Sequence, residues 1–309
     1  MSDSTAIRIE NLHKHFGRRR KKRVQAIKNL NLEVPAGQVY GFLGPNGSGK
    51  TTTIGMILGL LHPTAGSVTL FGDPVTPAQT RPLRRVGALV GAPTLVPYLS
   101  ARQNLKLLTH LSPELPSGRV DEILEIANLN EAANRRVGQF STGMKQRLGI
   151  AMALLHEPEL LILDEPTNGM DPAGMREIRV LLSQLAEQGV TIFISSHLLH
   201  EVEQICDRVA VLKKGQVIAE GNVKDLLGEQ TIVRVRVNCP NTAARCLHTL
   251  SGVTNVQPNG AYITVSGVSS QEVVAHLTSN DIIPSEVSTG RPDLESIFLE
   301  LIDSNTMEV

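Results

Sequence analysis

The chain has 309 residues, enough for about two domains with a sizeable hydrophobic core. The chain has 30 Lys plus Arg residues and 30 Asp plus Glu residues, so it carries no net charge that would attract nucleic acid or an anionic membrane. We therefore expect no nucleic-acid partner. The first residues lack a signal-peptide pattern, no apolar stretch approaches the about 18 residues of a membrane span, and the three cysteines have no metal or redox spacing. The composition therefore predicts a soluble cytoplasmic protein.

The chain begins with a predicted β-hairpin. Residues 7–16 alternate apolar and polar side chains, and residues 24–34 form the second expected strand. The basic run at residues 18–23 would lie at the tip of the hairpin, where such runs are most often solvated, although contact with nucleic-acid phosphates is the alternative. Phe16 would either pack in the core or stack on a nucleobase.

A phosphate-binding loop follows the hairpin. The eight residues that begin at Gly44 fit the pattern G-x-x-x-x-G-K-[ST], between an apolar strand at residues 39–43 and a helix that starts near Thr51. Glycines let successive N–H groups point toward a phosphate at the positive end of a helix. Lys50 adds a charge for the β- and γ-phosphates, and the Thr51 hydroxyl can bind Mg²⁺. The expected nucleotide-binding residues are Gly44, Pro45, Asn46, Gly47, Ser48, Gly49, Lys50, Thr51 and Thr52.

A helical insertion is predicted next. Strands are expected at residues 67–71 and 84–90, and helical periodicity then dominates an insertion at about residues 92–157. Ser141 precedes an apolar helix within this insertion. The simplest interpretation is a helix N-cap, whose exposed N–H groups would equally suit an anion.

Two carboxylates end the next apolar strand. Asp164, at the end of a buried strand that follows a phosphate loop, is the expected second Mg²⁺ ligand, and Glu165 is placed to act on a water molecule. Residues 190–196 form another buried strand, which ends at His197. A lone histidine at a strand end is more often structural than catalytic. Strands at residues 208–212 and 216–219 would close this domain.

The pattern changes near residue 230. The order β-α-β-β-α-β, with the hairpin signal Asn259-Gly260, suggests a small α+β unit of ferredoxin-like type, followed by a helix from Asp293. We therefore expect an ATP-binding domain at residues 1–228 and an accessory or dimerisation domain at residues 229–309.

With these segments in place, residues 5–228 resemble the ATPase subunit of an ATP-binding-cassette (ABC) transporter. The most specific part, Ser141-Thr142-Gly143-Met144-Lys145-Gln146-Arg147, looks like the family signature in its drug- and antibiotic-export form. Residues 293–300 are similar to the tail of that ABC-2 type subfamily, which includes bacitracin-, lantibiotic- and daunorubicin-type exporters. The resemblance implies an α/β P-loop NTPase (RecA-like) core with an antiparallel β subdomain and a helical insertion.

The resemblance also assigns site residues. Lys50 corresponds to the phosphate lysine, Thr51 and Asp164 to the Mg²⁺ ligands, Glu165 to the general base, and His197 to the histidine that contacts the γ-phosphate. Phe16 corresponds to the aromatic residue that stacks on adenine, and Asp171 to the loop that crosses between subunits. The signature residues would close over ATP held by the other subunit; they are Ser141, Thr142, Gly143 and Met144.

The family works as paired cassettes that power a membrane permease. Because this chain has one cassette, we expect it to form a homodimer, with a paralogue as the alternative partner, on the inner face of the membrane beside a separate permease. The runner-up is a soluble ABC ATPase that acts on ribosomes or DNA. One residue departs from the pattern, because Gly91 stands where the family usually has Gln or Glu.

Overall fold

The computed structural model describes residues 5–17, 23–76, 78–110, 115–227 and 232–290. The chain divides into two compact units, Met1–Gly221 and Asn222–Val309. This division lies one short helix, α7 (Val223–Leu227), before the expected boundary between residues 228 and 229. The basic residues at 18–22 and the helix expected from residue 293 lie outside the described residues.

An antiparallel sheet begins the first unit. Its strand order is β2-β1-β4-β5, and the predicted hairpin of β1 and β2 is confirmed. Alternate residues of β1, such as Ile7 and Ile9, are buried, because every second side chain of a strand faces the core. The strands are β1 (Thr5–Phe16), β2 (Val24–Pro35), β4 (Ala65–Leu70) and β5 (Asp73–Pro74).

The second sheet has six strands in the order β10-β9-β3-β8-β7-β6. Its strands are β3 (Val39–Leu43), β6 (Val86–Val90), β7 (Leu160–Asp164), β8 (Thr191–Ser196), β9 (Arg208–Lys213) and β10 (Gln216–Asn222). The strands β9, β3, β8, β7 and β6 pair in parallel, so their carboxyl ends meet at one edge of the sheet. Every residue of β3, β7 and β8 is buried, which explains their continuous apolar runs.

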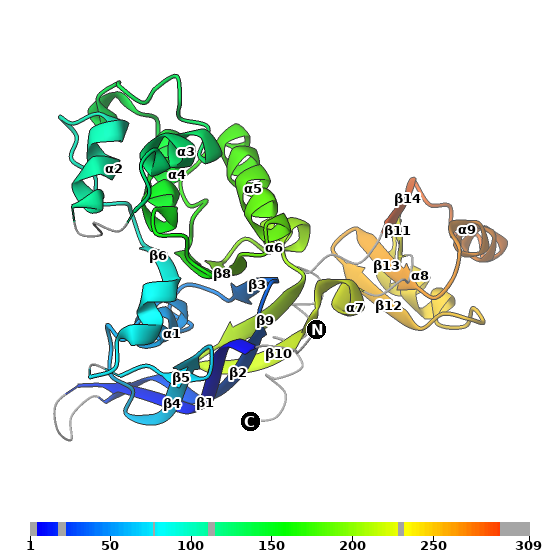
Figure 1. Ribbon diagram of the computed structural model, residues 1–309. Coiled ribbons are helices and arrows are strands. Elements are labelled where there is room, and N and C mark those ends of the chain that lie inside the picture. The colour runs from blue at the N-terminus through cyan, green and yellow to red at the C-terminus, as the bar shows by residue number, and fades with distance from the viewer. Residues whose placement is uncertain (1–4, 18–22, 77, 111–114, 228–231, 291–309) are drawn as a thin grey trace. The chain divides into compact units, whose positions relative to one another are not determined.

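Helices surround the parallel sheet. Figure 1 shows α2, α3 and α4 gathered at one end of this unit and β1, β2, β4 and β5 at the other, whereas α1 packs against β2, β4 and β7. The prediction of a strand at residues 84–90 is wrong at its start. A 3₁₀ turn that begins with Arg81-Pro82 extends through Arg85, so β6 begins at Val86. The helices are α1 (Lys50–Ile57), α2 (Ala101–Thr109), α3 (Arg119–Ile126), α4 (Thr142–Leu154), α5 (Pro172–Glu187) and α6 (Leu199–Ile205).

The second unit has the predicted β-α-β-β-α-β order after α7. Its antiparallel sheet has the order β12-β13-β11-β14, and its core joins strand residues such as Val233 and Ile263 to Leu247 and Leu277 of the two helices. The elements are β11 (Ile232–Arg236), α8 (Pro240–Leu247), β12 (Asn255–Asn259), β13 (Tyr262–Ser266), α9 (Ser270–Ser279) and β14 (Glu286–Gly290). In the described part of the chain, no helix has both the length and the apolar character needed to cross a membrane.

Candidate functional site

The phosphate-binding loop connects β3 to α1, and its backbone requires glycine. Gly49 has a φ of 114°, and a Cβ atom there would lie 2.6 Å from Ile27 Cδ1 and 2.9 Å from the Ala26 carbonyl oxygen. A Cβ on Gly44 would lie 2.3 Å from the Leu212 carbonyl oxygen. The Ser48 hydroxyl in the same loop is buried and has no hydrogen-bond partner among the described residues. The loop therefore combines a tight backbone with a buried polar group that a ligand can satisfy.

Lys50 is buried where the loop meets α1. Its Nζ donates to the Gly44 carbonyl oxygen at 2.7 Å and lies 3.1 Å from Glu165 Oε1. Its side chain is only 6% exposed, so these partners replace water around the ammonium group. A carboxylate of the same chain therefore balances the charge of the lysine.

Asp164 ends β7 with both carboxylate oxygens hydrogen-bonded. The Thr51 hydroxyl donates to Oδ2 at 2.9 Å, and the Ser195 hydroxyl donates to Oδ1 at 2.5 Å. Thr51 is 113 residues away in the sequence, and the parallel pairing of β7 with β8 places Ser195 directly beside Asp164. The fold thus brings a hydroxyl oxygen and a carboxylate oxygen together at the end of the phosphate loop.

Glu165 is the next residue, and its backbone is in the left-handed region with a φ of 51°. One oxygen, Oε1, faces Lys50, and the other, Oε2, lies 2.5 Å from Nδ1 of His197. His197 follows β8, so the segments that follow three adjacent strands, β3, β8 and β7, supply the polar side chains of the site. The structure therefore brings together five of the predicted site residues, namely Lys50, Thr51, Asp164, Glu165 and His197.

The signature residues lie on another element, at the start of α4. Ser141 caps this helix by accepting a hydrogen bond from the Met144 N–H at 3.2 Å, and Thr142 is the first helical residue. Asp171 caps α5 in the same way, by accepting from the Gly174 N–H at 3.1 Å. The two helix starts touch, because a Cβ on Gly143 would lie 3.2 Å from Cε of Met170. The signature and the predicted inter-subunit loop therefore form one surface.

Two further residues lie outside this group of contacts. Phe16 ends β1 with 40% of its side chain exposed, and Nζ of Lys14 lies 5.1 Å from its ring centroid. Gly91 follows β6, in which Val90 pairs with Asp164, so Gly91 lies beside the two carboxylates. Sequence reasoning missed Ser195, whose signal was the pair of serines that follows the apolar residues 192–194 at the end of β8.

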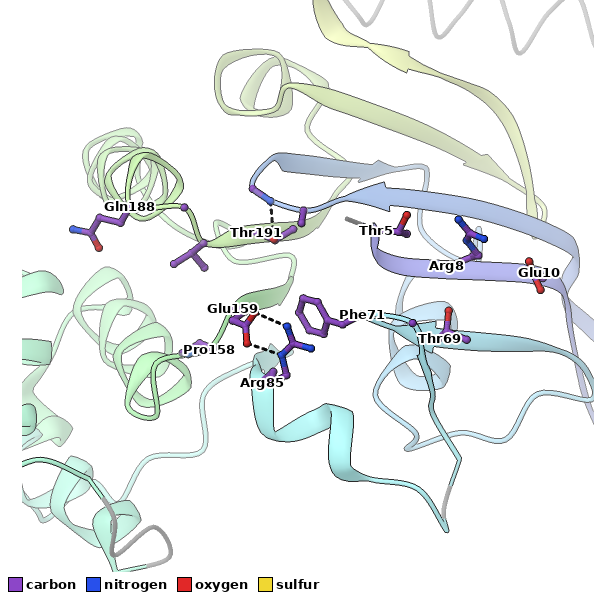
Figure 2. A pocket seen from close by; sticks show the side chains of 15 residues that line it. Thr5, Arg8, Glu10, Thr69, Phe71, Arg85, Pro158, Glu159, Gln188 and Thr191 are labelled. Carbon is purple, nitrogen blue, oxygen red and sulfur yellow. Dashed lines mark hydrogen bonds and ion pairs between the residues drawn. The ribbon is translucent and has the colours of Figure 1, made fainter. Parts of the chain in front are cut away.

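A cleft of about 800 Å³ lies at the opposite edge of the parallel sheet, among the amino ends of its strands. Figure 2 shows Arg85 between Phe71 and Glu159 in this cleft. The guanidinium lies 3.7 Å from the Phe71 ring centroid and donates two 2.5 Å hydrogen bonds to Glu159, which lower the pKa of that carboxyl. None of the lining residues belongs to the phosphate loop, so the cleft is separate from the site.

Comparison with known proteins decides the family. Residues 27–168 match the family model described as "ABC transporter". The chain is 47% identical to the bacitracin transport ATP-binding protein BcrA of Bacillus licheniformis, over 70% of each protein. It is 37% identical to the protein of that name from Enterococcus faecalis, over 96% of each. The chain belongs to the ABC transporter ATP-binding proteins.

A solved structure supports the same assignment for this ABC protein. The dimeric ATP-binding cassette MJ0796, bound to ADP and Pi, superposes with a TM-score of 0.63 at 28% identity, covering 71% of this chain and 99% of that one. The family and this fold identify the protein as an ABC ATPase, which binds and hydrolyses ATP to power a membrane transporter.

Proposed function

We propose that two copies of this chain enclose two ATP molecules and drive a separate membrane permease that exports an antibiotic, a lipid or another small amphipathic molecule. The observation that carries the proposal is the convergence of Lys50, Asp164, Glu165 and His197 at one edge of the sheet, next to the glycine-rich loop between β3 and α1. The bacitracin transport names of the relatives support this substrate class and favour transport over action on ribosomes or DNA.

The oxygen atoms at the end of the loop fit Mg²⁺. Mg²⁺ prefers oxygen ligands and keeps several waters, so one or two protein oxygens plus substrate phosphates suffice. Thr51 Oγ1 and Asp164 Oδ2, 2.9 Å apart, would hold the ion. Such an ion neutralises phosphate charge during phosphoryl transfer. The absence of a side chain at Gly91 leaves one further position to water.

ATP binding would replace the contacts that Lys50 and His197 make with Glu165 by contacts with the phosphates. Lys50 and His197 both contact Glu165, and the phosphates of ATP would compete with Glu165 for these two side chains. Once Lys50 has moved to the phosphates, a Glu165 oxygen is free to accept a proton from the attacking water. His197 then contacts the γ-phosphate. Contacts with Lys50 and His197 would thus occupy the general base until the phosphates take over those two side chains.

The signature surface fits an arrangement in which each subunit completes the partner's site. The start of α4 offers the N–H groups of a helix N-terminus, which favour anions, and Ser141 and Gly143 lie on this surface. We expect each copy to place this surface on ATP held by the other copy, with Asp171 at the contact. Phe16 would stack on adenine. The permease would contact the helical insertion, which places the ATPase at the inner face of the membrane.

The test combines fractionation with a site variant. The chain is tagged in its host, and its recovery with membranes is measured with and without the products of the neighbouring genes, among which a permease would be sought. We expect membrane recovery that depends on the permease, and Lys50→Ala should abolish ATP hydrolysis while leaving this recovery intact. Recovery with ribosomes or DNA instead would contradict the proposal.

A further inference from the structure

The Ser195 side chain connects the two carboxylates that end β7. Its hydroxyl donates to Asp164 Oδ1 at 2.5 Å and accepts a hydrogen bond from the Glu165 N–H at 3.1 Å. Ser195 is fully buried and lies on β8, the neighbouring strand. A single hydroxyl group therefore donates a hydrogen bond to the Asp164 carboxylate and accepts one from the backbone of Glu165.

The hydrogen bond to Oδ1 sets the orientation of the Asp164 carboxylate. The terminal torsion of Asp is broad, so packing alone leaves the plane of the carboxylate loosely defined. With Ser195 on Oδ1, the other oxygen, Oδ2, is turned toward the Thr51 hydroxyl. Asp164 is only 5% exposed, so water has little access to replace a lost partner.

The hydrogen bond from Glu165 supports an uncommon backbone conformation. Glu165 has a φ of 51°, which is unfavourable for a residue with a side chain and persists where surrounding contacts hold it. Its N–H is shared between the Ser195 hydroxyl and the Ser195 carbonyl oxygen, at 3.1 and 3.2 Å. This turn directs the Glu165 side chain toward Lys50 and His197.

We propose that Ser195 is a positioning residue that orients Asp164 toward the divalent cation and holds the Glu165 turn. The inference rests on the proposed Mg²⁺ site of Thr51 and Asp164. Groups that orient a metal ligand change metal affinity or activity by about 10- to 100-fold when they are removed. A purely structural serine would change stability without changing metal binding at a given nucleotide concentration.

The test measures cation binding rather than turnover. Mn²⁺ accepts the same oxygen ligands as Mg²⁺ and is visible by electron paramagnetic resonance. Its affinity is measured in the full-length wild type and in Ser195→Ala, each saturated with a non-hydrolysable ATP analogue; binding of that analogue in EDTA is measured separately. The matched control is Thr191→Val, which removes another buried hydroxyl that accepts a backbone N–H, at the other end of β8. Melting temperatures of all variants are recorded.

We expect Ser195→Ala to weaken Mn²⁺ binding by about 10- to 100-fold, with analogue binding in EDTA unchanged and Thr191→Val like the wild type. Should Ser195→Ala fail to fold, Ser195→Cys replaces it, since a thiol is a weak donor and acceptor. If Ser195→Ala binds Mn²⁺ as tightly as the wild type, or if Thr191→Val loses as much Mn²⁺ affinity as Ser195→Ala, the role proposed for Ser195 is wrong, and the proposed metal site is unaffected. Failure of the wild type to bind Mn²⁺ with the analogue overturns the proposed metal site as well.

Discussion

The substitution Glu165→Gln tests two roles of one side chain. It keeps the shape of Glu165 and removes the charge and the proton acceptor. A positioned general base contributes about 10²- to 10⁴-fold to a rate, which corresponds to about 3–5 kcal/mol of transition-state stabilisation. We therefore expect the rate of ATP hydrolysis to fall by that factor and the closed dimer to accumulate with bound ATP.

The same substitution should strengthen ATP binding. Glu165 Oε1 lies 3.1 Å from Lys50 Nζ and Oε2 lies 2.5 Å from His197 Nδ1, and the phosphates of ATP would compete for both groups. A hydrogen bond to a charged group contributes about 1.5–3 kcal/mol, and glutamine retains part of it. A net gain of about 1–2 kcal/mol in ATP binding follows, which is roughly a 5- to 30-fold lower Kd.

Two assays on purified protein check these effects. Steady-state phosphate release gives the rate, and equilibrium binding of ATP in EDTA gives the affinity without hydrolysis. Glu159→Gln is the matched control, because Glu159 precedes the same strand at its opposite end and pairs with Arg85 away from the site. A wild-type rate in Glu165→Gln would refute the general base, and a weakened affinity would refute the competition between Glu165 and the phosphates.

The remaining predictions concern the second subunit and the residue after β6. In mixed dimers, Lys50→Ala in one subunit and Ser141→Arg in the other should damage the same composite site and leave the second site intact. If one subunit carries both changes and its partner is wild type, both composite sites should be damaged. Equal ATPase rates for the two arrangements would exclude shared sites. Gly91 has a φ of 70° and open space around its Cβ position, so Gly91→Gln should cost about 1 kcal/mol in unfolding free energy and raise the basal ATPase rate. Gly72→Gln, at a φ of 85° with equally open space, is the control and should change stability alone; an unchanged basal rate and Mg²⁺ dependence in Gly91→Gln would disprove the effect.

Local sequence patterns were sufficient to predict most of the helices and strands. The apolar run at Val39–Leu43 followed by the phosphate-loop pattern predicts strand, loop and helix, because each signal lies within a few neighbouring residues. The alternation in β11 and the Asn259-Gly260 turn likewise predicted the order of the second unit. The expected start of β6 was two residues early, because Arg84 and Arg85 were assigned to the strand although they end a 3₁₀ turn that contains Pro82.

Within the site, sequence alone determined the residue types and their chemistry, whereas tertiary structure decided their partners. Motif and resemblance pointed to Lys50, Asp164, Glu165 and His197, but no local pattern indicates that Lys50 and His197 both contact Glu165. The role of Ser195 is also a tertiary property. It depends on β8 lying beside β7 in a register that pairs Ser195 with Asp164, and strand order in a parallel sheet is set by long-range packing that neighbouring residues do not encode.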